Sequence, residues 1–151
     1  MSDLIHPNPS FSWLREIADP YMNEFHNQVN ETLHLAVLKN DELYYLNKWD
    51  TSRSLRVVIQ SRTGGHAPLH CTGLGKMLLA GQEQSYLDEV IPKLKFEGFT
   101  KNQKVIAAIS ITVPQVRLTP KRKPELLNEI KDIAGNISDE IRGNEGNLYQ
   151  R

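Results

Sequence analysis

The run LHLAVL at residues 33–38, the polar stretch KNDE at 39–42 and the run LYYLNKW at 43–49 decide the fold of this chain. Both flanking runs are mainly apolar or aromatic and have the length of strands. The four polar residues between them favour a tight turn. The stretch therefore predicts a β-hairpin, and the helical segments around it are expected to pack against the sheet that it forms.

On the N-terminal side, residues 1–10 hold two prolines and several turn formers, and we expect them to form a loose arm. The next segment repeats apolar residues at helical spacing, at Leu14, Ile17, Ala18, Tyr21, Phe25 and Val29. Pro20 interrupts this pattern and leaves two alternatives open. Either Asp19 caps a second helix that begins at Pro20, or one long helix is kinked there.

Two β-rich segments follow the hairpin. Residues 54–61, SLRVVIQS, predict a strand beside it, whereas residues 104–113, KVIAAISITV, form the clearest strand of the chain. The alternation along residues 104–113 predicts one apolar core face, made by Val105, Ala107, Ile109, Ile111 and Val113. The other face, made by Ile106, Ala108, Ser110 and Thr112, is small and partly polar and suits the wall of a cavity.

Two further helices are expected towards the C-terminus. Residues 82–90 predict a short helix that Pro92 stops. Thr119 and Pro120 predict the cap and first turn of a last helix, which ends at Gly143. Its apolar stripe is Leu126, Ile130, Ile133, Ala134, Ile137 and Ile141. The sequence thus predicts an α+β domain over residues 11–143, with a mainly antiparallel sheet packed by helices, and a frayed tail at 144–151.

The stretch GGHAPLHCTGLGKMLLA, residues 64–80, predicts a Gly-Gly turn and a loop that ends on a helix. Thr72 is the expected N-cap, Gly81 the expected left-handed C-terminal residue, and the amides of Gly73, Leu74 and Gly75 lack helical partners. Such amides can bind a small anion. Spacing alone favours a plainer alternative, a turn that only leads into a helix. A nucleotide P-loop is excluded because Met77 follows Gly75-Lys76 and His70 replaces its first glycine.

The composition excludes several classes of protein. Lys plus Arg and Asp plus Glu are both 18, which argues against a nucleic-acid clamp, and the cluster at 121–123 is a solvated patch. The single cysteine, Cys71, excludes an intramolecular disulfide and a zinc site of several thiolates. The sequence shows no signal peptide and no membrane-spanning apolar run, so we expect a cytoplasmic protein without membrane contact.

Catalysis and metal binding are not expected from the remaining candidates. His66, His70 and Cys71 are neighbours in a loop and cannot easily place a thiol, a base and an orienting group. Satisfied loop histidines and a buried cysteine explain them better, so no catalytic residue, metal ligand or cofactor is predicted. Ser110 and Thr112 share one strand face and either donate hydrogen bonds to a ligand carboxylate or simply lie on a polar surface.

Several segments of the chain resemble, in order, the effector domain of IclR-type bacterial transcription regulators. Residues 14–51 resemble its first helix and hairpin, residues 64–80 its most recognisable loop and helix, and residues 95–102 and 104–122 later segments of the domain. The resemblance implies a GAF-like domain that binds a small organic acid and forms dimers or tetramers. It implies ligand contacts at the amides of Gly73 and Leu74 and the hydroxyls of Ser110 and Thr112, with Leu69 and Met77 as apolar cover.

Two departures from the family pattern accompany this resemblance. No helix-turn-helix domain precedes the effector domain, so DNA contact is expected only through a domain that this chain lacks. The family also carries a helix and two strands between what are here Asn102 and Lys104, where this chain has a gap. The absence of this family segment is expected to remove strands from the sheet and part of the ligand pocket.

Three functions are therefore considered. The leading one is the ligand-sensing and oligomerisation domain of an IclR-type regulator that binds a small carboxylate. The alternative is a non-sensing dimerisation fragment with an incomplete pocket. A small enzyme that uses Cys71 ranks last.

Overall fold

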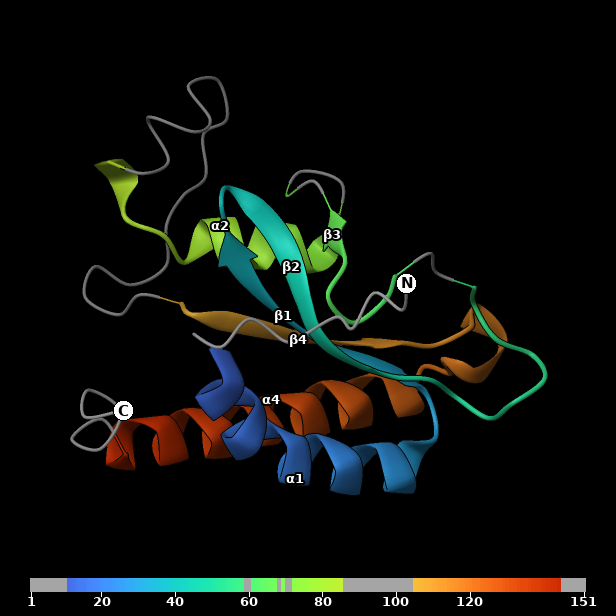
Figure 1. Cartoon of the computed structure of the whole chain (residues 1–151). Helices are drawn as coiled ribbons and strands as arrows, with labels where there is room; N and C mark the ends of the chain where they lie inside the picture. Colours follow the sequence, from blue (N-terminus) through green and yellow to red (C-terminus); the bar gives the residue numbers. More distant parts are fainter. Residues whose placement is uncertain (1–10, 59–60, 68, 70–71, 86–104, 145–151) are drawn as a thin grey trace, which may run out of the picture.

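A computed structural model of the chain describes residues 11–58, 61–67, 69, 72–85 and 105–144. Its elements, in chain order, are α1 (Ser12–Val29), β1 (Thr32–Lys39), β2 (Glu42–Trp49), β3 (His66–Ala67), α2 (Gly73–Ala80), β4 (Ala107–Thr112), the short 3-10 helix η3 (Gln115–Arg117) and α4 (Arg122–Gly143). The strands form an antiparallel sheet in the order β3-β2-β1-β4. Helices α1 and α4 cover one face and α2 covers the other (Figure 1). The predicted α+β class is confirmed.

The predicted hairpin is β1 and β2. Asn40 and Asp41 connect the strands, and both have positive φ angles, of 50° and 61°. A two-residue turn with two positive φ angles matches the right-handed twist of the strands that it joins. One irregularity between Leu35 and Ala36 shifts the register, so that Leu35 lies opposite Asn47 and Ala36 lies opposite Tyr45.

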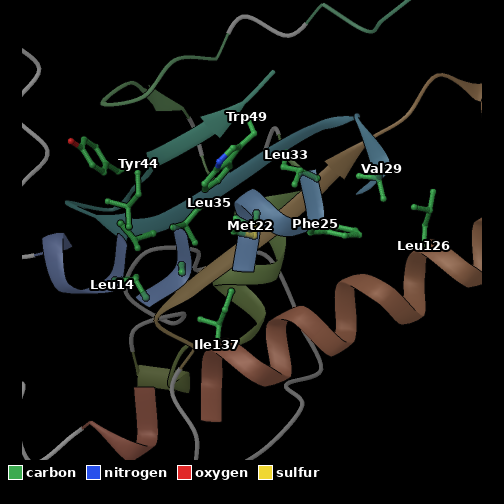
Figure 2. Packing of buried hydrophobic residues seen from close by; sticks show 13 residues of the cluster. Leu14, Met22, Phe25, Val29, Leu33, Leu35, Tyr44, Trp49, Leu126 and Ile137 are labelled. Carbon is green, nitrogen blue, oxygen red and sulfur yellow. The ribbon is translucent and has the colours of Figure 1, made fainter. Parts of the chain in front are cut away.

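The larger core lies between the sheet and the helices α1 and α4, and we call it the α1–α4 layer (Figure 2). Alternate residues of β1 and β4 point into it, including Leu33, Leu35 and Val37 from β1 and Ile109 and Ile111 from β4. The helices contribute Leu14, Ala18, Met22, Phe25, Val29, Leu126 and Ile137, all of them buried. The apolar stripes predicted for both helices are therefore confirmed.

Helix α1 continues through Pro20, so the two-helix alternative is wrong. Asp19 does not cap a helix; its Oδ1 accepts a hydrogen bond from Asn47 Nδ2 at 3.1 Å. Buried residues on both sides of Pro20, from Leu14 to Val29, hold the helix against the sheet. This tertiary packing outweighs the backbone hydrogen bond that proline cannot make.

The smaller core lies under α2 on the opposite face, and we call it the α2 layer. Its buried members are Ala36, Leu43, Tyr45, Leu69, Leu74, Leu78, Leu79 and Ala108. Val105 packs against this layer and not against the other, because it precedes β4 and does not follow its alternation. The predicted face of Val105 is thus wrong, whereas the faces of the later residues are confirmed.

The expected left-handed conformation of Gly81 is also wrong, since its φ is −92°. Its missing side chain serves another purpose. A Cβ at this position would collide with the side chain of Val105, whose N–H donates to the Gly81 carbonyl at 3.2 Å. Gly81 therefore allows the chain before β4 to approach the end of α2 closely.

The strand predicted at 54–61 is absent from the described part of that segment, residues 54–58 and 61. β3 pairs with β2 instead, and Leu55, Val57 and Val58 are exposed. The segment is tied to η3, where Arg117 donates to the Leu55 carbonyl at 2.7 Å and to both carboxylate oxygens of buried Glu31 at 2.7 and 2.8 Å. A hydrogen bond from the ion-paired Arg117, and not sheet formation, therefore holds this loop.

The last helix begins at Arg122 and not at Pro120 as predicted. Thr119 still provides an acceptor for an unpaired amide at the start of the helix, because its Oγ1 accepts a hydrogen bond from the Arg122 N–H at 3.1 Å. The helix ends at Gly143, as expected.

Candidate functional site

The start of α2 has the geometry that the sequence predicts. Thr72 is the N-cap, and its Oγ1 accepts from the Gly75 N–H at 2.9 Å. Gly75 is thereby removed from the predicted set of unpaired donors, and this expectation is corrected. Gly73 and Leu74 are the remaining helix-start amides of that set, and Gly73 is exposed. The positive end of the helix dipole lies at the same place.

Gly75 has a structural role in placing this helix start. A Cβ on Gly75 would collide with the backbone carbonyl of Leu69. Leu69 is buried with Leu74 and Leu78 in the α2 layer. The absence of a side chain at position 75 thus lets the loop before α2 pack directly against the helix.

Ser110 and Thr112 lie on the face of β4 that looks towards α2. Ala108 on the same face belongs to the α2 layer, and alternation along the strand places the two hydroxyl residues beside it. Both are partly buried. Ser110 follows Thr72 by 38 positions in the sequence. The structure nevertheless brings the two predicted hydroxyl residues and the start of α2 to one face of the sheet.

A buried histidine that we did not single out in the sequence joins this face. His34 of β1 lies directly opposite Ser110 and is only 2% exposed. Its Nε2 lies 2.7 Å from Ser61 Oγ and its Nδ1 lies 3.4 Å from Ser110 Oγ. The signal in the sequence was a single polar residue inside the apolar run 33–38, on the α2 side of the strand.

Charged groups and a cleft lie beyond His34. Lys48 pairs with His34 in the sheet register, and its Nζ donates to the Ser61 carbonyl at 3.1 Å and contacts Asp50 Oδ1 at 3.1 Å. Ser61 is also one wall of a cleft of about 370 Å³, whose other lining residues are Tyr45, Arg62, Gly65 and His66. His34 therefore connects β4 to the rim of a cleft that also includes a guanidinium group.

The site holds His34 in its neutral form. Burial lowers the pKa of His34 from 6.5 to about 4; the nearby Lys48 also lowers it, and Asp50 partly opposes this. A group whose pKa is lower in the folded protein than in the unfolded chain makes its full contribution to stability above the unfolded pKa. This contribution is lost as the pH falls from the unfolded to the folded pKa.

We therefore expect a pH-dependent loss of stability that His34 causes. Between pH 6.5 and pH 4 the free energy of unfolding should fall by about 3 kcal/mol through this group, since one pKa unit corresponds to about 1.4 kcal/mol. Urea unfolding over this range, with His34→Asn as the comparison, isolates the contribution. Parallel pH profiles for the two proteins would contradict it.

The two predicted apolar covers lie in different environments. Leu69 is buried under α2, whereas Met77 is 60% exposed. Met77 contributes nothing to either core cluster of the described residues.

Of the three candidates for metal binding or nucleophilic catalysis, the structure describes His66. His66 contacts Glu42 through Nδ1 at 3.3 Å and packs edge-on against Tyr44. His70 and Cys71 lie outside the described residues, as do most of the helix predicted at 82–90 and all of residues 95–102. In the described part of the chain, no group of three or more metal-ligating side chains comes together. No described helix has the length and apolar character needed to span a membrane.

Known proteins with similar sequences are bacterial regulators. Residues 12–103 match the family described as the bacterial transcriptional regulator IclR C-terminal domain. The HTH-type transcriptional regulator KdgR of Dickeya chrysanthemi is 26% identical over 166 residues, which cover 82% of this chain and 54% of the relative. KdgR of Escherichia coli strain K12 is 32% identical over 84 residues, 56% of this chain and 31% of the relative. The chain thus spans about half the length of the first relative and about a third of the second.

Solved structures confirm the fold. The C-terminal domain of E. coli KdgR matches with a TM-score of 0.65 and 22% identity, over 85% of this chain and 98% of that domain. The Thermotoga maritima IclR matches with 0.69 and 20%, over 85% and 68%. An IclR homolog from Microbacterium hydrocarbonoxydans complexed with 4-hydroxybenzoate matches with 0.68 and 19%, over 92% and 72%. The chain belongs to the IclR family of bacterial transcriptional regulators, in which it corresponds to the C-terminal domain.

Proposed function

We propose that this domain senses a small organic acid and mediates subunit association in an IclR-type transcriptional regulator. One observation carries the sensing part: the start of α2 and the Ser110 and Thr112 hydroxyls, which are distant in sequence, lie on one face of the sheet. Backbone amides at a helix start and hydroxyl groups are donors that suit a carboxylate.

The chemistry of the ligand follows from these donors. The proposed contacts are the Gly73 and Leu74 amides with Ser110 and Thr112, and Leu69 and Met77 are the proposed apolar cover. An IclR homolog with this fold was crystallised with 4-hydroxybenzoate, which is itself a small carboxylate. Because the relatives are regulators named for a helix-turn-helix, we assign DNA reading to such a motif and not to this domain, and the acid acts by favouring one subunit arrangement.

The test is stabilisation by carboxylates that depends on Ser110. We expect an acid from a panel of 4-hydroxybenzoate, pyruvate and gluconate to raise the melting temperature, because a ligand at 100 times its Kd stabilises a protein by about 2.7 kcal/mol. Ser110→Ala should weaken binding by about tenfold, since a hydrogen bond to a charged group contributes about 1.5–3 kcal/mol. Ser138→Ala is the matched control, because Ser138 is exposed on α4 and bonds its own helix at Ala134.

Two results would contradict acid sensing. One is the absence of any shift across the panel. The other is binding by Ser110→Ala that equals binding by Ser138→Ala.

A specific observation also supports the alternative, a dimerisation fragment that does not sense. The alignment with the Dickeya relative is longer than the part of this chain that it covers, so the relative holds residues that this chain lacks. The family match ends at residue 103, where the predicted gap lies, and β4 is an edge strand of the described sheet.

This alternative makes a separate prediction about assembly. A dimerisation fragment should sediment as a dimer and form mixed oligomers with a full-length relative, whether or not an acid is present. Sedimentation velocity of the chain, alone and mixed with E. coli KdgR, measures both. A monomer that never forms mixed species would exclude the alternative.

A further inference from the structure

Two hydrogen bonds join His34 to Ser61 and Ser110, and a bound carboxylate would favour one of the two directions in which they can run. His34 bridges Ser61 Oγ and Ser110 Oγ through its two ring nitrogens, at 2.7 and 3.4 Å. Its ring is buried and also lies against Tyr45, with the ring centroids 5.4 Å apart. In this setting the two serines are the hydrogen-bond partners found for the imidazole among the described residues.

A neutral imidazole has one N–H donor and one acceptor nitrogen, so the bridge has two possible directions. When Nε2 carries the proton, it donates to Ser61, and Nδ1 accepts the Ser110 hydroxyl proton. Ser110 then has no proton left to give to a carboxylate. When Nδ1 carries the proton, it donates to Ser110 Oγ, and the Ser110 hydroxyl is available to an anionic ligand.

The second direction imposes a requirement on Ser61. Nε2 is then an acceptor, and it is satisfied when the Ser61 hydroxyl donates to it. The Ser61 carbonyl accepts a hydrogen bond from Lys48 Nζ at 3.1 Å, and the same ammonium group lies 3.1 Å from Asp50 Oδ1. Hydrogen bonds then run in one direction from Ser61 through His34 to Ser110, and such chains strengthen one another.

We propose that His34 is a positioning residue for the acid site: its Nδ1–H tautomer orients the Ser110 hydroxyl towards a ligand carboxylate and requires Ser61 as the donor at Nε2. This inference rests on the proposed function and adds the residues that prepare Ser110 for its ligand. It also extends the site from β4 to Ser61, which lines the cleft together with Tyr45 and Arg62.

The test reads the tautomer directly. Nitrogen-15 NMR of histidine-labelled protein at pH 7.5 distinguishes the two neutral tautomers, and it is recorded without ligand and with 4-hydroxybenzoate, pyruvate or gluconate. With a bound acid we expect the pattern of an Nδ1–H imidazole for His34. Ser61→Ala should weaken binding of that acid about fivefold, although Ser61 does not contact it. The combined loss in Ser61→Ala with Ser110→Ala should be smaller than the product of the single losses.

The outcomes separate this inference from the proposed function. An Nε2–H pattern in the bound state overturns the inference, and so does a Ser61→Ala variant that binds the acid as well as the control Ser138→Ala. In either case, wild-type binding that depends on Ser110 still supports acid sensing. Absence of acid binding by the wild type overturns both. Ser61→Ala removes only a hydroxyl from a partly exposed loop position, so the test avoids replacing the buried histidine.

Discussion

Gly75→Ala is expected to destabilise the domain by about 3 kcal/mol, at the upper end of the usual cost of overpacking. The new Cβ would meet the Leu69 carbonyl, which is backbone and cannot rotate away. Relief requires the loop before α2 to move, and that movement takes the buried Leu69 side chain out of the α2 layer. Urea unfolding followed by far-UV circular dichroism measures the loss, provided that the slope of the transition is unchanged.

Gly73→Ala is the matched control two residues earlier in the same helix. A Cβ at position 73 has no neighbour within 4 Å, and Gly64 is the only described glycine with positive φ. Alanine favours helix over glycine, so this variant should be neutral or more stable by up to about 1 kcal/mol. Equal effects at positions 73 and 75 would show that helix propensity, and not the approach of Leu69, governs this site.

Phe25→Ala is expected to cost about 3–5 kcal/mol, the range for removing a large aromatic side chain from a core. Phe25 is 1% exposed and lies in the α1–α4 layer with Leu33 and Leu126 (Figure 2). It joins α1, the sheet and α4, so its cavity would weaken contacts in all three. Since small domains are typically stable by about 5–15 kcal/mol, this single change removes a large share of that stability.

Leu127→Ala on α4 is the control for this prediction, because Leu127 is 48% exposed and neighbours the buried Leu126. Its replacement should change the free energy of unfolding by less than about 0.5 kcal/mol. Both variants are compared by urea unfolding at pH 7. A cost at Phe25 as small as that at Leu127 would mean that the α1–α4 layer is not a continuous core.

Local patterns were sufficient wherever one short segment carried the information. The polar turn at 39–42, the apolar stripes of α1 and α4 and the Thr72 cap each depend on residues within a few positions of one another. For the same reason the alternation along β4 correctly separated the face of Ala108 and Ser110 from the core face of Ile109 and Ile111. The hairpin, the helices and the cap at the start of α2 were therefore predictable.

Two of the errors occurred where a distant residue decided the outcome. The β-rich segment 54–58 became an exposed loop because β3 pairs with β2 and because Arg117 links the segment to Glu31. A side chain at position 81 would collide with Val105, and this close approach, not a left-handed backbone, is what requires glycine there. Propensity and periodicity contain no term for such long-range contacts.

The sequence by itself determined the family, the hairpin, the main helices and the layer that most residues of α1, α4 and β4 face, because these follow from local spacing and from the match over residues 12–103. Only the tertiary structure decided that His34 joins Ser61 and Ser110, which are 27 and 76 positions away. The reason is the sheet register: antiparallel pairing of β1 with β4 and β2 places His34 between Ser110 and Lys48, and burial then keeps its imidazole neutral.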